Sequence, residues 1–185
     1  IIGLTYSPND LCDQEDGTLV LRSSNILEGE MVFNNNVYVK SKIPKKLMIH
    51  ENDILICSRN GSRNLIGKCA FATNENINYS FGAFTTVFRS NINSYIFKIL
   101  NSNIFKSQAG KFLTSTINQL TIGNLNSFEI ALPPKIEQKA IINYIEDKTL
   151  KLDKAIDLEQ QQITKLKEYK TTLIDSVVTG KVKVT

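Results

Sequence analysis

The sequence predicts an α+β protein in two parts, a globular region of short mixed strands over residues 1–133 and a long coiled-coil α-helix over residues 134–180, with a short tail at 181–185. Three observations predict this fold. Short apolar runs alternate with turn signals in the first part. Two adjacent prolines, Pro133 and Pro134, then mark a boundary. Beyond them, from Lys135 to Thr179, there is neither glycine nor proline. The length fits one domain with an accessory element.

The first region is predicted to be rich in strands. Residues such as Val, Ile and Phe cluster in short runs, and clusters of Asn, Gly, Ser and Glu separate them. The runs expected to form strands are residues 19–21, 31–33, 37–39, 54–57, 65–71 and 84–88. The expected turns are residues 28–30, 34–36, 59–62 and 74–76. Over 94–113 the apolar spacing changes and predicts one or two short amphipathic helices, with a break at 101–103.

The second region is predicted to be one continuous helix. Pro134 suits a first helical turn, and Gly180 stands where a helix end is expected. A helix from Lys135 to Thr179 would be about 65 Å long. Alternating steps of four and three residues give the coiled-coil repeat of 3.5 and place aliphatic side chains on one seam. These are Ile145, Leu152, Ile156, Ile163, Leu166, Leu173 and Val177. Such a seam requires a partner helix, from the same fold, another copy or another subunit, with packing against its own domain alone as the plain alternative.

Composition restricts the functional classes. The formal net charge is +4, which by itself does not indicate nucleic acid. No apolar run reaches the roughly 18 residues that a membrane-spanning helix needs. The three cysteines show no disulfide or zinc spacing, and Cys57 and Cys69 are expected to be small buried residues in a reducing cytoplasm. His50 is the only histidine, so no imidazole cluster can form.

No strong catalytic motif is present. The string 61–68 resembles a P-loop, but its glycines are spaced by five residues instead of four, and Cys69 replaces the magnesium-binding Ser or Thr. Glu137 and Lys139 match the E-x-K fragment of many nucleases, although they fall in the first turns of the predicted helix. A non-enzyme without cofactor or metal is therefore expected, with a small nuclease as a weak alternative.

Several segments resemble the specificity subunits of type I restriction–modification systems. Residues 130–141 (IALPPKIEQKAI) resemble the segment that leads into the conserved region of that family, and residues 166–181 (LKEYKTTLIDSVVTGK) resemble the end of that region. Residues 51–62 (ENDILICSRNGS) and 65–68 (LIGK) resemble the "G-D-I-L…R-x-G-S…I-G-K" core of its target recognition domain. Residues 21–26 (LRSSNI) resemble an earlier strand and turn. Asn52 departs from the glycine common in the family.

The resemblance implies a function and partners. Family members carry recognition domains alternating with long conserved helices, and full-length members carry two of each. This chain has one of each and so resembles a half subunit or an excised half of a longer one. The helices pair antiparallel as a spacer, so a homodimer is expected. The implied partners are double-stranded DNA with a bipartite site, modification subunits that methylate adenine with S-adenosylmethionine, and a restriction subunit.

The turn at 58–63 is the predicted DNA contact. Arginine can bond guanine bidentately and asparagine can bond adenine, while phosphate contacts would set the register. The candidates there are Ser58, Arg59, Asn60, Ser62 and Arg63, with Arg59 and Arg63 foremost. Weaker candidates are Lys68, Gln108, Lys111, Ser115 and Thr116. A polar hairpin turn is the plain alternative.

One more reading belongs to a different class of function. The chain could be an assembly or adaptor module whose helix recruits a partner while the globular region binds protein. Salt-sensitive DNA binding distinguishes a DNA-recognition subunit from such a module.

Overall fold

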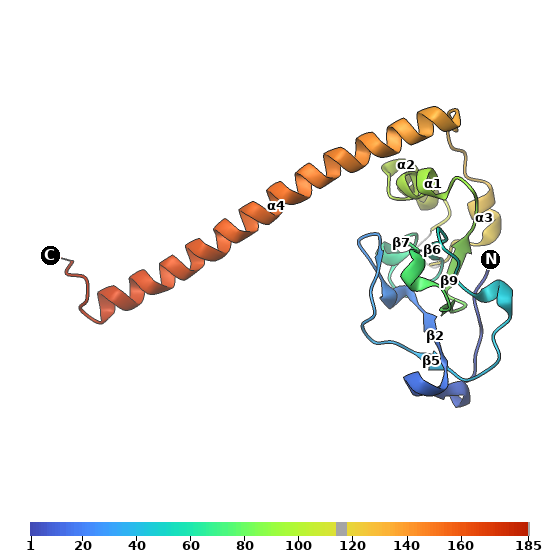
Figure 1. The fold of residues 1–185 in the computed structure, drawn as a ribbon, viewed down its shortest axis with the longest axis horizontal. Helices are drawn as coiled ribbons and strands as arrows, with labels where there is room; N and C mark the ends of the chain where they lie inside the picture. The colour runs from blue at the N-terminus through green and yellow to red at the C-terminus, as the bar shows by residue number, and fades with distance from the viewer. Residues whose placement is uncertain (114–117, 185) are drawn as a thin grey trace. The chain divides into compact units, whose positions relative to one another are not determined.

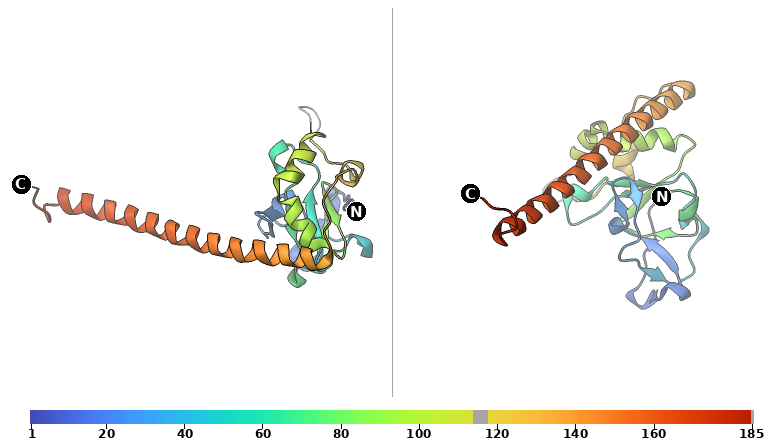
Figure 2. Two further views of the ribbon diagram at one scale, coloured as in Figure 1. Left: turned by 90° about the horizontal axis from the view of Figure 1, so that it is seen from above. Right: turned by 60° about the vertical axis from the view of Figure 1, so that its left-hand side comes forward.

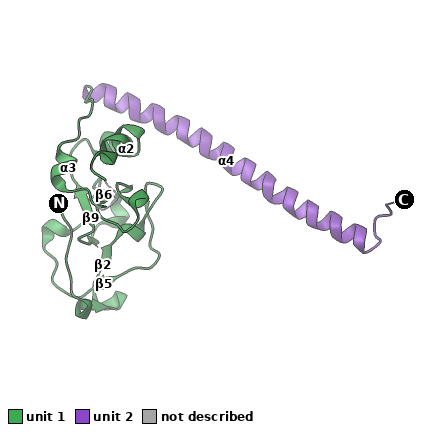
Figure 3. Cartoon of the chain, turned by 180° about the vertical axis from the view of Figure 1, so that it is seen from behind, with its two compact units in different colours: residues 1–133 green, residues 134–185 purple. Residues whose placement is uncertain are grey.

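The computed structural model describes residues 1–113 and 118–184. The chain divides into two compact units, Ile1–Pro133 and Pro134–Thr185 (Figure 3). The first unit holds short strands and helices, and the second holds one long helix (Figure 1). The expected α+β class is confirmed.

Unit 1 begins with a small four-stranded sheet, ordered β1-β5-β2-β8. Its strands are β1 (Leu11–Cys12), β2 (Thr18–Leu21), β5 (Tyr38–Val39) and β8 (Ser80–Phe81). The β1–β5 and β2–β5 pairs are antiparallel, and β2 pairs with β8 in parallel. Because β2 and β8 run parallel, this pairing brings the residues that follow each strand to the same edge, although they are distant in sequence.

A tight hairpin joins β3 (Ile26–Leu27) to β4 (Glu30–Met31). Its two-residue loop is Glu28 and Gly29, with φ values of 49° and 91°. Positive φ at both positions is the requirement of a type I′ turn, whose twist matches that of paired strands. The turn expected at 28–30 is confirmed.

The second sheet has three antiparallel strands in the order β7-β6-β9. Its central strand β6 (Ile54–Cys57) is buried along its whole length, between β7 (Cys69–Phe71) and β9 (Thr85–Phe88). A strand buried on both faces is expected to be continuously apolar, and the run Ile-Leu-Ile-Cys meets that requirement. The strand predicted at 54–57 is confirmed.

Two strand expectations are wrong in extent. The run 65–71 forms a strand only from Cys69, because residues Arg63–Leu65 make a 3₁₀ turn and Gly67 has a φ of 84°. A residue with a side chain cannot adopt that backbone conformation without strain. A Cβ at Gly67 would also lie 2.8 Å from the Phe105 ring. Similarly, β4 ends at Met31, so the strand expected at 31–33 is shorter.

Three short helices gather at one end of unit 1, beside the three-stranded sheet, with β2 and β5 toward the other end (Figure 1). They are α1 (Asn93–Leu100), α2 (Asn103–Gly110) and α3 (Ile122–Asn126). Ser102 caps α2 by accepting the Ile104 N–H, so the break predicted at 101–103 is confirmed. Helix α3 was not foreseen from the sequence.

Among the described residues, two apolar clusters make up much of the core of unit 1. The larger lies between the sheets and the smaller beneath α2. The larger contains Leu19, Leu21, Ile26, Leu47, Ile49, Leu55, Cys57, Ala70, Ala72, Phe81 and Val87. The smaller contains Ile66, Phe105, Ala109, Leu113 and Leu120. Together they make a rigid support for the loops at its surface.

Unit 2 is the single helix α4 (Lys135–Val178), drawn from two further directions in Figure 2. Its 44 residues give a length of about 66 Å. Pro134 precedes it as the N-cap, and Gly180, with a φ of 73°, follows Thr179 at its end. Glycine at this place adopts the left-handed conformation without the penalty of a side chain. The predicted helix is confirmed.

Candidate nucleic-acid interface

The predicted contact residues lie in the loop of residues 58–68, which connects β6 to β7. Both ends of this loop are held by backbone hydrogen bonds. The Cys57 N–H donates to Lys68 O at 2.9 Å, and the Gly67 N–H donates to Cys57 O at 2.8 Å. The loop also pairs with a segment distant in sequence, because the Leu120 N–H donates to Ser58 O at 2.8 Å. The 58–68 loop is therefore longer than the expected hairpin turn but well anchored.

Arg59 is the most defined cationic group of the 58–68 loop. Its backbone N–H donates to Phe84 O at 3.0 Å, and its guanidinium carbon lies 5.1 Å from the centroid of the Phe84 ring. Phe84 stands at the turn between β8 and β9 and is 57% exposed. A cation–π contact of this kind contributes about 0.5–1 kcal/mol at an exposed site and uses none of the guanidinium N–H donors. The ring thus orients the guanidinium without consuming its hydrogen bonds.

Arg63 and Ser62 lie on the outer part of the 58–68 loop and are exposed. Arg63 begins the 3₁₀ turn Arg63–Leu65, and Ser62 precedes it. Within the described residues neither Arg59 nor Arg63 forms an ion pair, so both keep their full charge for a ligand. Gly61 lies between Asn60 and Ser62. No atom lies within 4 Å of the position that a Cβ would take there, which allows close approach of another molecule.

Asn60 braces the 58–68 loop from within. Its Nδ2 donates to Ser23 Oγ at 2.9 Å, and its Oδ1 accepts the Ser62 N–H at 2.9 Å. The Asn118 amide adds a further bond to Gly61 O at 3.1 Å. Both polar atoms of the Asn60 side chain, Nδ2 and Oδ1, therefore have partners in the chain. The side chain joins the loop to the segment after β2.

Ser58 does not lie in an exposed turn, and this expectation is wrong. It is 5% exposed, and its hydroxyl donates to Phe84 O at 3.1 Å, because the loop leaves the sheet only after this residue. The Lys68 ammonium is also hydrogen-bonded within the chain, because its Nζ donates to Ile26 O at 2.7 Å. Its ammonium holds the β3 strand close to β7.

The weaker candidates are dispersed. Gln108 brackets Glu129, donating to its carbonyl at 2.7 Å and accepting its N–H at 2.9 Å. Lys111 is exposed at the end of α2. Ser115 and Thr116 lie outside the described residues. The foremost candidates, Arg59 and Arg63, therefore lie together on the 58–68 loop. No described contact joins Gln108 or Lys111 to that loop.

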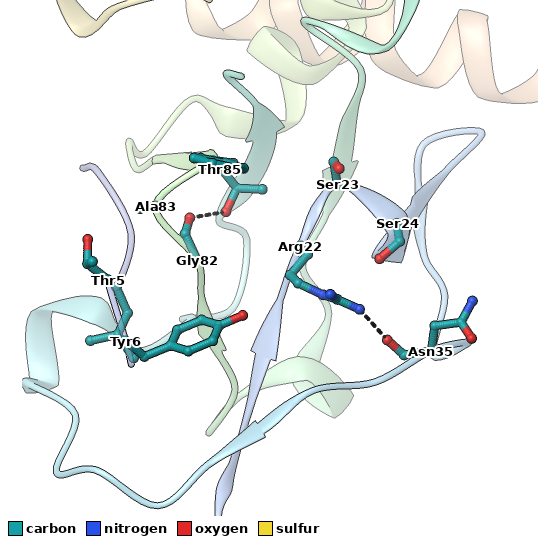
Figure 4. Close-up of a pocket in the computed structure, with 11 residues that line it drawn as sticks. Thr5, Tyr6, Arg22, Ser23, Ser24, Asn35, Gly82, Ala83 and Thr85 are labelled. Carbon is teal, nitrogen blue, oxygen red and sulfur yellow. Dashed lines mark hydrogen bonds between the residues drawn. The ribbon is translucent and has the colours of Figure 1, made fainter. Parts of the chain in front are cut away.

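A cleft of about 530 Å³, here called the Arg22 cleft, is lined by two residues that the 58–68 loop contacts. Two of its lining residues are Ser23, which bonds Asn60, and Phe84, which carries Arg59. The remaining walls come from the N-terminal segment, the residues after β2 and the turn between β8 and β9 (Figure 4). The lining residues are Leu4, Thr5, Tyr6, Arg22, Ser23, Ser24, Asn35, Gly82, Ala83, Phe84 and Thr85.

Arg22 is the only charged residue among those that line the cleft. Its Nη2 donates to Asn35 O at 2.7 Å, and its Nε is buried without a hydrogen-bond partner among the described residues. A buried donor left unpaired costs about 1–3 kcal/mol, and more for a charged group. Arg22 was missed as a site residue in the sequence, although the Arg-Ser-Ser string directly after a buried strand was a usable signal.

Arg89 has a structural role. Its Nε and Nη2 form a fork onto the two carboxylate oxygens of Asp53, at 2.7 and 2.6 Å, and Asp53 is 1% exposed. The Asp53 hydrogen bond raises the pKa of the Arg89 guanidinium. The same carboxylate accepts the His50 N–H at 2.8 Å, which fixes the turn before β6. The Nε and Nη2 donors of Arg89 are therefore occupied by Asp53 and are not available to a ligand.

The two buried cysteines are expected to have thiols of low reactivity. Burial raises the pKa of the Cys57 thiol, and it raises the pKa of the Cys69 thiol to about 12. Both sit on strands of the β7-β6-β9 sheet, as small core residues. Within the described residues no group of three or more His, Cys, Asp or Glu side chains is placed to hold a metal ion.

Helix α4 carries the predicted aliphatic seam at its surface. Leu152, Ile156 and Leu166 are each more than 60% exposed, and Ile163 and Leu173 are nearly half exposed. Ile145 and Val177 are half-buried. No helix in the described part of the chain combines the length and apolarity needed to cross a membrane.

Comparison with known proteins gives one consistent family. Residues 5–168 match the family model of the type I restriction modification DNA specificity domain. The chain is 24% identical to the type I restriction enzyme EcoKI specificity subunit of Escherichia coli strain K12 and 24% identical to the StySPI specificity subunit of Salmonella potsdam. These matches cover 98% and 97% of this chain. The chain spans about 40% of the length of each relative.

Solved structures of related systems share the fold. A chain from a structure concerning assembly and conformational transition of the type I R-M system superposes with a TM-score of 0.75, at 14% identity. It covers 95% of this chain and 42% of that one. The HsdS subunit from Thermoanaerobacter tengcongensis gives a TM-score of 0.63 at 19% identity, covering 89% of this chain and 45% of that one.

Proposed function

The chain belongs to the type I restriction–modification DNA specificity family, and from this membership we propose that it recognises a DNA sequence and directs partner subunits to it. Unit 1 reads the DNA, and unit 2 sets the spacing between two reading units. The partners are adenine methyltransferase subunits and a restriction subunit, which supply the chemistry. The chain itself acts without catalysis and without a cofactor.

One observation carries the assignment of the reading surface. The 58–68 loop presents Arg59 and Arg63, both exposed, beside the Arg22 cleft that has no acidic lining residue. Phosphate contacts of such cations give affinity that falls with salt, and guanidinium forks on base edges give sequence preference. A loop held by backbone bonds at both ends loses little freedom on binding, which favours a defined reading geometry.

Unit 2 is proposed to dimerise through its aliphatic seam. Fully burying side chains such as Leu152, Ile156 and Leu166 contributes about 1.5–3 kcal/mol each before entropy is subtracted. An antiparallel pair of α4 helices places two copies of unit 1 at opposite ends of a rod and relates them by a twofold axis. A twofold axis makes the two half-sites equivalent, so the expected DNA target is symmetric and interrupted.

The test of this function is a selection from random duplex DNA. We expect the chain, together with its methyltransferase subunits where binding requires them, to recover one defined sequence in a salt-sensitive manner. If no sequence is enriched and binding does not respond to salt, the chain is an assembly module and the proposed function is wrong. Metal-dependent cleavage by the purified chain that is lost in Glu137→Ala and Lys139→Ala would instead support the nuclease alternative.

A further inference from the structure

We propose that the Arg22 cleft binds a backbone phosphate of the duplex, next to the bases that the 58–68 loop reads. This inference rests on the proposed function and adds a second DNA contact of different chemistry. The two sites are neighbours through defined contacts, because the Asn60 amide bonds Ser23 and the Arg59 guanidinium stacks on Phe84. A duplex lying on the loop therefore passes over the cleft.

Shape distinguishes the two contacts. Base edges lie at the floor of a groove and are reached by parts of a protein that protrude, such as an exposed loop. The sugar–phosphate backbone protrudes from the duplex, so a concave surface accommodates it. The 58–68 loop supplies the protruding element, and the cleft of about 530 Å³ supplies the concave one.

The lining of the cleft has the chemistry that phosphate requires. Arginine, serine, threonine, tyrosine and asparagine side chains are the usual donors to phosphate oxygens. The cleft offers Arg22 with the hydroxyl groups of Thr5, Tyr6, Ser23 and Ser24. In Figure 4, Tyr6 and Arg22 project from different segments, with the Tyr6 hydroxyl directed toward the Arg22 side. No lining residue is acidic, so nothing within the cleft repels an anion.

The state of Arg22 indicates a ligand. Its Nη2 is held by Asn35 O, which orients the guanidinium along the wall, yet within the described residues no carboxylate neutralises the charge. Its Nε is a buried donor without a partner. A phosphate beside this guanidinium supplies the opposite charge that no carboxylate of the described residues provides. Arg89 shows the contrast, because Asp53 satisfies the same two positions of its fork.

The experiment uses the full chain, with its partner subunits where binding requires them, and two probes: a duplex recovered by selection and a duplex of unrelated sequence. The variants are Arg22→Gln and Ser24→Glu. Ser24 is exposed, so the second variant places a carboxylate in the cleft without disturbing a buried group. Ser94→Glu is the matched control, since Ser94 is exposed in α1, beyond the opposite end of β9 from the cleft.

We expect Arg22→Gln and Ser24→Glu to weaken binding of both probes by a similar factor of about ten. In Arg22→Gln the slope of log K against log salt should shrink by about one. Base preference and the Ser94→Glu control should not change. Replacing single phosphates by uncharged methylphosphonates should lower the affinity of the wild-type chain at a position flanking the read bases, and Arg22→Gln should be insensitive there.

Two results would overturn the inference. If Arg22→Gln alters the preferred base at one position with an unchanged salt slope, the guanidinium reads a base. If Ser24→Glu and Arg22→Gln bind both probes like the wild type, the cleft lies outside the DNA contact. In both cases the wild-type chain still selects a sequence, whereas failure of the proposed function would remove that selection altogether.

Discussion

The Arg59 guanidinium lies over the Phe84 ring, with 5.1 Å between the guanidinium carbon and the ring centroid. Arg59 follows β6 and Phe84 precedes β9, so both lie at the same end of this antiparallel pair, where a backbone hydrogen bond from the Arg59 N–H to Phe84 O joins them. The consequence is an exposed arginine that an aromatic ring positions by a contact that uses none of its N–H donors. This pair is the centre of the proposed reading surface.

Replacing Arg59 by alanine is expected to lower specific DNA affinity by about 1–3 kcal/mol, because a bidentate contact to a base is lost. Arg59→Lys keeps the charge but not the fork, so it should lose base preference while nearly retaining the salt slope. Salt-matched anisotropy titrations against the selected and a mismatched duplex measure both quantities. Unchanged affinity and unchanged preference in Arg59→Ala would show that the 58–68 loop is not the reader.

A charged residue in the α4 seam is expected to weaken self-association. Ile156→Asp and Leu166→Asp each place a carboxylate where an apolar contact between helices is proposed, and burying that charge is costly. Sedimentation equilibrium should show a larger dissociation constant for both. Gln161→Asp introduces the same charge at an exposed position outside the seam and should associate like the wild type. Equal association of all three variants would exclude the seam.

The DNA target is expected to be two equivalent half-sites separated by bases that are not read. This follows from the twofold symmetry of an antiparallel pair of identical chains. Sequencing of the duplexes recovered by selection measures it directly. Recovery of asymmetric or contiguous sites only would contradict dimerisation through α4, while leaving DNA binding by unit 1 intact.

Arg89→Ala is expected to destabilise unit 1 by about 3–5 kcal/mol, because removal of one partner leaves the buried Asp53 carboxylate without its counter-charge. Equilibrium unfolding in urea provides the measurement. Arg63→Ala is the matched control, since Arg63 is exposed and its loss should change stability by no more than about 0.5 kcal/mol. Similar unfolding midpoints for both variants would show that the Asp53–Arg89 pair contributes little.

Thiol reactivity should separate the three cysteines. Only the thiolate attacks a disulfide reagent, so a raised pKa lowers the reactive fraction at pH 8. Burial raises the pKa of Cys57, and raises that of Cys69 to about 12, so both should react with Ellman's reagent only after unfolding. Cys12 is half-buried and should react in the native chain. A Cys12→Ser chain should therefore show no fast thiol, and rapid modification of Cys69 in it would contradict the burial.

Local chemistry in the sequence was sufficient for the elements that depend on it. Helix α4 could be bounded to within a residue or two, because proline, glycine and the absence of helix breakers act on neighbouring positions. The same holds for β6, whose side chains are all apolar, and for the break before α2, which Ser102 caps. In the 58–68 loop, Arg59 and Arg63 could be predicted as DNA contacts because arginine side chains bond guanine and phosphate.

Tertiary structure alone decided which polar groups are available. Ser58 and Lys68 were both candidates in the sequence, yet the Ser58 hydroxyl and the Lys68 ammonium each donate to a backbone carbonyl of a distant segment. The Arg22 cleft likewise unites four segments separated in sequence, two of which are brought together by the parallel pairing of β2 with β8. A hydrogen bond depends on where two groups meet in space, and a sequence pattern specifies only which groups exist.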